Sequence, residues 1–209
     1  MNVTFTNHLN QRYTFVHIPK TAGKSVSAYI LKHATEVRTL HDKSHATLDE
    51  IQSTGQDLGH TFAIGRNPYS RAVSLYRYLH EADIRKLAQE ADPHFGTQSN
   101  LDWYYNWSQQ NGRKCTFSKF CEKLPYVPLG EFQYPYVNVN SLFKFEEINK
   151  VNIFLKEIFN TNEDLFYLNK TGDTNYEKYY DKYSAKIVFK TYKKDFKALG
   201  YSKNINISI

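Results

Sequence analysis

The segment of residues 13–27, YTFVHIPKTAGKSVS, restricts the possible folds of this chain more than any other. Its largely apolar run over residues 15–18 breaks at Pro19, and a short polar turn then leads into a helical pattern with apolar residues at Val26 and Ile30. A strand, a tight turn and a helix in this order direct backbone N–H groups and a helix N-terminus toward an anion. The segment therefore predicts an anion-binding turn at the end of a buried strand.

The composition fits one globular domain with an anionic partner. A chain of 209 residues is long enough to bury a core, and we expect a single domain over residues 1–209. With 27 Lys and Arg against 21 Asp and Glu, the formal net charge is +6, which favours a nucleotide or a sulfated or phosphorylated sugar as ligand. The charge is spread along the chain rather than concentrated in blocks, so nucleic acid is not the partner that we expect.

Two strand–helix pairs follow one another along the chain. We expect strands over residues 12–18 and 61–65 and helices over 23–34 and 69–80, with Pro68 at the first helical position of the second helix. Strands that alternate with helices across short turns are typical of α/β proteins with a parallel sheet. Ligands of such sheets bind beyond the carboxyl ends of the strands, so PKTAGKS and the later motif RNPYSR are expected to face the same crevice.

Further elements are predicted from caps and periodicity. Thr47, with Glu50 three residues later, forms a candidate capping box. Residues 81–135 are less regular, and we expect a mostly helical region there. The remaining expected elements are a helix over 117–124, a strand over 142–145, a helix over 148–159 and a helical stretch over 176–199 that ends at Gly200 as a C′ glycine.

Cysteine usage and hydropathy lead us to expect a cytoplasmic protein. Cys115 and Cys121 have no metal-ligand companions at a useful spacing, which predicts reduced thiols. The N-terminal sequence MNVTFTNHLN lacks the basic-then-apolar pattern of a secretion signal. No run approaches the roughly 20 apolar residues of a membrane span.

The turn invites comparison with the GxxxxGK[ST] phosphate loop of nucleotide kinases and hydrolases. Gly23, Lys24 and Ser25 match its last three positions, whereas Ile18 occupies the position of its first glycine and is followed by Pro19. An Ile-Pro pair restricts the backbone and removes an N–H donor where that loop must wrap a phosphate. A kinase should also place an acidic residue for Mg²⁺ at the end of an apolar strand, and no candidate occupies such a position. A P-loop kinase or hydrolase stays as the second hypothesis.

A set of motifs extends the comparison over most of the chain. The segments are HIPKTAGKS, RNPYSRAVSLY, FEEI, LNKTG with YEKYYD, and DFKALGY, in order from about residue 13 to residue 201. Together they resemble the family of sulfotransferases that includes the heparan and chondroitin carbohydrate sulfotransferases and many bacterial relatives. The resemblance implies a P-loop-type sheet with a helical acceptor side. It also implies transfer of a sulfuryl group from 3′-phosphoadenosine 5′-phosphosulfate (PAPS) to an acceptor hydroxyl or amine.

The same resemblance assigns the residues that would bind PAPS. Arg66 and Ser74 would bind the 3′-phosphate, and the planar guanidinium of Arg66 can donate two parallel hydrogen bonds to a phosphate. Lys170 would neutralise phosphate at the nucleotide end. The family's turn commonly reads PKTAGTS, so a lysine replaces a threonine in this chain. The turn would hold the 5′-phosphosulfate through Pro19, Lys20, Thr21, Ala22, Gly23, Lys24 and Ser25.

Sulfuryl transfer depends on positioning and charge stabilisation, but it still requires a base for the acceptor's proton, and histidine suits neutral pH. His45, in the segment KSHATLDEI, resembles the family's catalytic histidine, and His41 is the alternative. Lys20 is expected to stabilise the charge that develops on the leaving phosphate. Lys24 could have the same role, and the sequence does not distinguish between the two lysines. His17 is expected to be a hydrogen-bonded core histidine that braces the turn. No carboxylate cluster suggests a metal, and we expect none.

Residues 81–135 lie outside the PAPS motifs and are expected to form the acceptor side. Aromatic residues such as Trp103 and Trp107, with cations such as Arg113, suit a carbohydrate or another hydroxyl compound, although they would equally fill a helical subdomain. A non-enzymatic polyanion-binding protein is the third hypothesis, because it requires only the basic charge and the aromatic residues.

Overall fold

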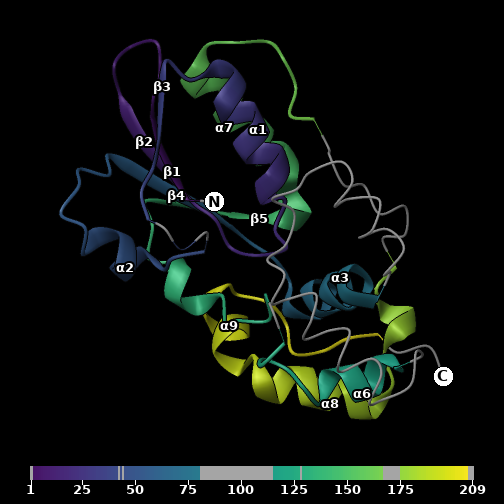
Figure 1. The fold of residues 1–209 in the computed structure, drawn as a ribbon. Coiled ribbons are helices and arrows are strands. Elements are labelled where there is room, and N and C mark those ends of the chain that lie inside the picture. The colour runs from purple at the N-terminus through teal and green to yellow at the C-terminus, as the bar shows by residue number, and fades with distance from the viewer. Residues whose placement is uncertain are drawn as a thin grey trace. The chain divides into compact units, whose positions relative to one another are not determined.

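The computed structural model describes residues 2–41, 43, 45–80, 115–127, 129–166 and 175–206. These residues form two compact units, which we call the sheet unit and the helical unit (Figure 1). The sheet unit consists of the described parts of Met1–Asn67, Phe132–Thr174 and Tyr192–Lys203. The helical unit consists of the described parts of Pro68–Glu131, Asn175–Thr191 and Asn204–Ile209.

The sheet unit is built on a five-stranded sheet in the order β3-β1-β2-β4-β5. β2, β4 and β5 pair in parallel, whereas β1 lies antiparallel between β2 and β3. The α/β class is therefore confirmed, but the expectation of a wholly parallel sheet is wrong, because the sheet is mixed. The strands are β1 (Val3–Thr6), β2 (Arg12–Val16), β3 (Glu36–Thr39), β4 (His60–Gly65) and β5 (Ser141–Lys144).

A short hairpin accounts for the antiparallel strand. Oδ1 of Asn7 accepts the N–H groups of Leu9 and Gln11, each at 2.9 Å, and so closes the turn between β1 and β2. Strands joined by so short a turn pair antiparallel, since parallel strands need a long crossover. β1 and β3 are not among the predicted elements. Each has only four residues: β1 alternates Val3 and Phe5 with threonines over too short a run to stand out, and β3 is largely exposed and shows no hydrophobic period.

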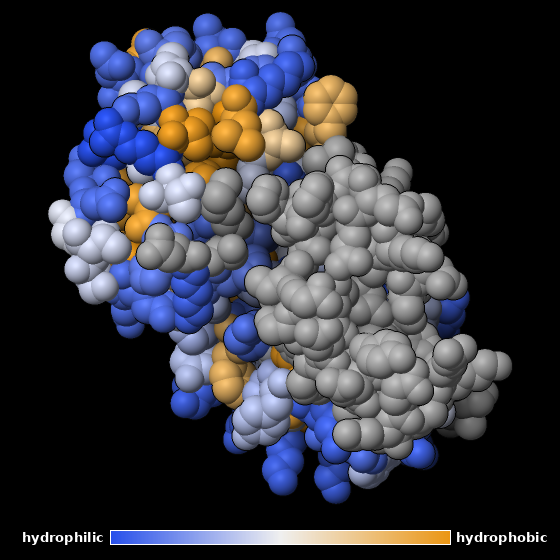
Figure 2. Space-filling view, viewed as in Figure 1, coloured by the Kyte–Doolittle hydropathy of each residue, from blue (hydrophilic) through white to orange (hydrophobic). Residues whose placement is uncertain are grey.

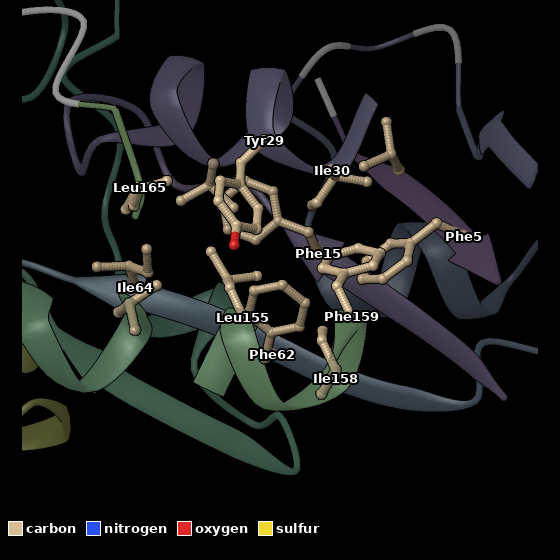
Figure 3. Close-up of a cluster of buried hydrophobic side chains, with 13 residues drawn as sticks. Phe5, Phe15, Tyr29, Ile30, Phe62, Ile64, Leu155, Ile158, Phe159 and Leu165 are labelled. Atoms are coloured by element: carbon tan, nitrogen blue, oxygen red, sulfur yellow. The ribbon is translucent and has the colours of Figure 1, made fainter. Parts of the chain in front are cut away.

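Apolar side chains of the sheet alternate between its two faces. On one face, Phe15 and Phe62, with ring centroids 5.1 Å apart, pack with helices α1 (Gly23–His33) and α7 (Ile148–Phe159). Figure 3 shows this cluster, in which the ring centroid of Tyr29 of α1 lies 6.0 Å from that of Phe159 of α7. The predicted helix over 148–159 is confirmed at both boundaries.

The other face of the sheet carries the second core. Ala63 packs there with α2 (Leu48–Gln52) and with the 3-10 helix η1 (Tyr134–Tyr136). The predicted capping box begins α2. Thr47 Oγ1 accepts the Glu50 N–H at 3.3 Å, and the Glu50 carboxylate accepts the Thr47 N–H at 2.6 Å. This cap fixes the start of a helix of only five residues.

The helical unit contains α3, α6 and α8, which pack on one another. The Tyr76 ring of α3 packs against the rings of Phe117 and Phe120, each at a centroid distance of 5.3 Å. Arg71 is 2% exposed and donates from Nη2 to the Leu129 carbonyl at 2.9 Å. Residues 81–114 and 128 of the expected acceptor side lie outside the described residues. The bounds in this unit are α3 (Pro68–His80), α6 (Phe117–Cys121), η3 (Glu177–Tyr179) and α8 (Lys182–Thr191).

The helical stretch predicted over 176–199 is interrupted in the structure. Tyr192, at φ −100° and ψ 25°, separates α8 from α9 (Lys193–Ala198), a helix of the sheet unit. Gly200 has a φ of 64°, and the Tyr201 N–H bonds to the Phe196 carbonyl at 3.0 Å. The expected C′ glycine is therefore confirmed.

The described surface is mostly hydrophilic in the view of Figure 2, with a small hydrophobic group in its upper part. Leu31 of α1 and Ile153 of α7 are among the exposed large apolar residues, at 58% and 56%. Among the helices that the structure describes, none has the length and apolar character needed to cross a membrane.

Candidate functional site

The turn between β2 and α1 contains two residues that adopt left-handed backbone geometry without being glycine. Lys20 has a φ of 68°, and Ala22, the N-cap of α1, has a φ of 71°. This geometry costs a non-glycine residue roughly 1–2 kcal/mol, and such conformations concentrate at functional sites. Ala22 supplies no side-chain cap to the first turn of α1. The turn thus resembles an anion-binding helix N-terminus rather than a capped helix start.

Several other side chains of this segment are buried beneath the turn. Thr21 is fully buried, and its Oγ1 donates to the carbonyl three residues earlier at 2.8 Å. Pro19 and Ser25 are buried as well, whereas Lys20 is half-buried and Lys24 is exposed. The seven residues predicted to hold the 5′-phosphosulfate are therefore the turn and the first three residues of α1, with Lys20 half-buried and Lys24 exposed.

Gly23 is required by the close approach of a histidine ring. A Cβ at this position would lie 1.7 Å from Nε2 of His17. The His17 side chain is buried, which lowers its pKa well below 6.5, and the positive charges of Lys20 and Lys24 act in the same direction. His17 is therefore a neutral histidine beneath the turn, as its expected bracing role requires.

His45 lies against the end of β2. Its Nδ1 is 3.2 Å from the His17 carbonyl oxygen, and the two ring centroids are 4.6 Å apart. A carbonyl oxygen can only accept a hydrogen bond, so Nδ1 is the donor, and whenever the ring is neutral Nε2 then carries the lone pair. The Tyr136 hydroxyl donates to the His45 carbonyl at 2.9 Å. The predicted base is thus held in the tautomer that a general base using Nε2 requires.

Arg66, at the end of β4, is brought to the turn. Its Nη1 donates to the Lys20 carbonyl at 3.1 Å, and its guanidinium lies over the Phe145 ring at 4.1 Å from the centroid. β2 and β4 are neighbouring parallel strands, so both motifs leave the same edge of the sheet. The rest of RNPYSR, from Pro68 onward, belongs to the helical unit, so the crevice expected between the two motifs stays a prediction.

Two buried polar residues that sequence reasoning missed hold Arg66 in place. Gln133, fully buried, accepts the Arg66 N–H at 3.0 Å and donates to the Arg66 carbonyl at 2.9 Å. The carboxylate of Asp195, also fully buried, accepts the backbone N–H groups of Gln133 and Tyr134, each at 2.9 Å. Asp195 belongs to the motif DFKALGY, and its place in this motif is the only feature of the sequence that could have indicated its role.

Glu146, in the segment FEEI, has a structural role. Its carboxylate accepts the Asn67 N–H at 3.0 Å and the Tyr201 hydroxyl. Burial, together with this bond to Glu146, raises the pKa of Tyr201 far above 10. The pair ties the residue that follows Arg66 to the start of α7.

Three further predicted residues are not part of the group described in the sheet unit. Ser74 belongs to α3 of the helical unit, and Lys170 lies outside the described residues. His41 accepts the Lys43 N–H on Nδ1 at 2.9 Å, a bond within its own loop. Within the part of the chain that the structure describes, no group of three His, Cys, Asp or Glu residues could hold a metal ion.

Comparison of the chain with models of protein families, with curated proteins and with solved structures gave no match in any of the three. The functional assignment therefore rests on the motifs and on the geometry of the turn.

Proposed function

We propose that this protein is a PAPS-dependent sulfotransferase. The observation that carries the proposal is the bond from Arg66 to the Lys20 carbonyl, because it joins two cationic motifs at one edge of the sheet. A turn that suits one anionic group, with a fixed guanidinium beside it, fits a ligand with two anionic ends. PAPS, with its 3′-phosphate and 5′-phosphosulfate, is such a ligand. The P-loop type of the sheet is part of this proposal.

The proposed chemistry is an in-line displacement at sulfur. The acceptor oxygen forms a bond to sulfur while the bond from sulfur to the 5′-phosphate oxygen breaks, which releases 3′-phosphoadenosine 5′-phosphate (PAP). His45 Nε2 takes the acceptor's proton, since its Nδ1–H is engaged with the His17 carbonyl. Lys20, half-buried in the turn, stabilises the negative charge on the leaving phosphate.

Other assignments in the proposal rest on the sequence alone. Ser74 and Lys170 would add contacts to the 3′-phosphate and the nucleotide end. The acceptor is proposed to be a carbohydrate or another hydroxyl compound, bound by residues 81–135.

Binding of PAP tests the proposal without any knowledge of the acceptor. PAP without metal should raise the melting temperature, because a ligand at 100 times its Kd adds about 2.7 kcal/mol to the unfolding free energy. Arg66→Ala should weaken PAP binding about 10- to 100-fold by calorimetry, since a hydrogen bond to a charged group contributes about 1.5–3 kcal/mol. Arg38→Ala is the matched control: Arg38 lies on β3 of the same unit and pairs with Glu36. Its variant should bind PAP as the parent does.

Each competing function predicts a different result. Stabilisation by ATP only with Mg²⁺ would support a kinase or hydrolase. Stabilisation by polyanions with a steep salt dependence would support a binding protein. If PAP fails to stabilise the protein, or if Arg66→Ala and Arg38→Ala bind PAP equally, the sulfotransferase proposal is wrong. A positive result leads to an acceptor screen with sulfur-labelled PAPS.

A further inference from the structure

A buried asparagine connects the two segments that carry the candidate histidines. Asn2, which precedes β1, is 1% exposed. Its Oδ1 accepts the His17 N–H at 2.7 Å, and its Nδ2 donates to the Ala46 carbonyl at 2.9 Å. One side-chain amide thus bridges the end of β2 and the loop before α2, and it uses a donor and an acceptor as a peptide group would.

Together with the bond made by His45, these two bonds form a closed circuit of hydrogen bonds. Asn2 holds the N–H of His17, while His45 Nδ1–H bonds to the carbonyl of the same residue. Asn2 also holds the carbonyl of Ala46, the next residue after His45. The Asn2 side chain therefore fixes two things at once: the backbone next to His45, and the residue whose carbonyl accepts the bond from the His45 ring.

From this geometry we infer that Asn2 is a positioning residue for His45, an inference that rests on the proposed function. By holding both segments, Asn2 keeps the His17 carbonyl within reach of Nδ1. This contact maintains the Nδ1–H tautomer and aims Nε2 for proton transfer. Without it, the imidazole would redistribute between its two tautomers, and the fraction competent as a base would fall.

Two substitutions separate this role from simple stabilisation. Asn2→Asp keeps an acceptor for the His17 N–H but places a carboxylate oxygen against the Ala46 carbonyl, where a donor is required. Asn7→Asp is the matched control, because Asn7 lies at the other end of β1 and is also 1% exposed. Its Nδ2 donates to the Ile158 carbonyl at 2.9 Å, away from both histidines.

The first measurement is independent of any activity. Nitrogen-15 spectra of histidine-labelled protein report which ring nitrogen of each histidine carries hydrogen. We expect His45 to be largely Nδ1–H in the parent and in Asn7→Asp, with the Nε2–H form rising several-fold in Asn2→Asp. If Asn2→Asp does not fold, Asn2→Ala tests the same residue, because it removes both side-chain bonds without adding a charge. An unchanged His45 tautomer in the folded variant would overturn the inference.

The second measurement uses sulfuryl transfer. Displacement of a reacting group by about 1 Å costs up to about 100-fold in rate, so Asn2→Asp should lower kcat about 10- to 100-fold and leave the KM for PAPS within about twofold. The acidic limb of the kcat–pH profile should shift in Asn2→Asp and stay in place in Asn7→Asp. A loss of kcat that is equal in the two variants would show a structural role only. If the tautomer changes as expected but the parent transfers no sulfuryl group, the proposed function fails and the positioning of His45 by Asn2 stands.

Discussion

The contact between Gly23 and the His17 ring allows a sharp test by substitution. In Gly23→Ala, the new methyl carbon would lie 1.7, 1.9 and 2.4 Å from three atoms of the His17 ring. The ring cannot swing aside freely, because it stacks on Phe15 and packs against His45 at centroid distances of 5.7 and 4.6 Å. Overpacking of this kind costs about 1–3 kcal/mol, whereas a glycine-to-alanine change in a helix otherwise gains about 0.5–1 kcal/mol. We expect a net loss of about 1–2 kcal/mol in urea unfolding.

The double variant provides the decisive comparison. In His17→Ala the ring is absent, while the backbone bonds of residue 17 to Asn2 and His45 keep their donor and acceptor. Gly23→Ala should then become neutral or stabilising by up to about 0.5–1 kcal/mol, so that the loss seen in the parent disappears. If Gly23→Ala costs the same in both backgrounds, the ring does not lie against this glycine, and the account of the turn given above is refuted.

Three further predictions concern stability and reactivity. A hydrogen bond from Lys43, helped by the capping box, lowers the pKa of Glu50 from 4.5 to about 2, so its stabilisation is complete above pH 4.5 and is lost as the pH falls toward 2. The difference in unfolding free energy between the parent and Glu50→Gln should shrink over that window, and a constant difference would contradict it. Asp195→Asn should cost about 2–4 kcal/mol in urea unfolding, because an amide N–H₂ would meet a buried backbone N–H; a cost below about 0.5 kcal/mol would contradict the buried bonds. Burial raises the pKa of Cys115 to about 11, so at pH 8 a thiol reagent should label it slowly in the native protein and rapidly in urea. Rapid native labelling would show that this thiol is accessible.

Local patterns with caps were predictable from the sequence. The helix over 148–159 has apolar residues at helical spacing, and the Thr47–Glu50 box depends on residues three positions apart. The turn after β2 was also predictable, because one continuous segment contains the strand, the break and the helix start. The outcome for β1 and β3 was different, since each depends on partners that short four-residue patterns do not specify.

The contacts that arrange the site were beyond the reach of sequence reasoning. Asn2 bonds to residues 15 and 44 positions away, and Gln133 bonds to Arg66 across 67 positions. Neither residue belongs to a recognised motif, and a single asparagine or glutamine carries no signal of its own. The motifs supplied the groups that would touch a ligand, whereas the buried amides that orient those groups are defined only by the tertiary structure.

The antiparallel placement of β1 has a practical consequence. Val3 pairs with Phe15, so the amino end of β1 lies beside the carboxyl end of β2. Any polypeptide joined ahead of residue 2 therefore starts at the edge of the sheet from which the turn and Arg66 emerge. The length and charge of an amino-terminal affinity tag would therefore affect ligand binding at this edge of the sheet. An acidic tag would compete with an anionic ligand, and a basic tag would attract one, so untagged protein is the proper reference for every binding measurement on this chain.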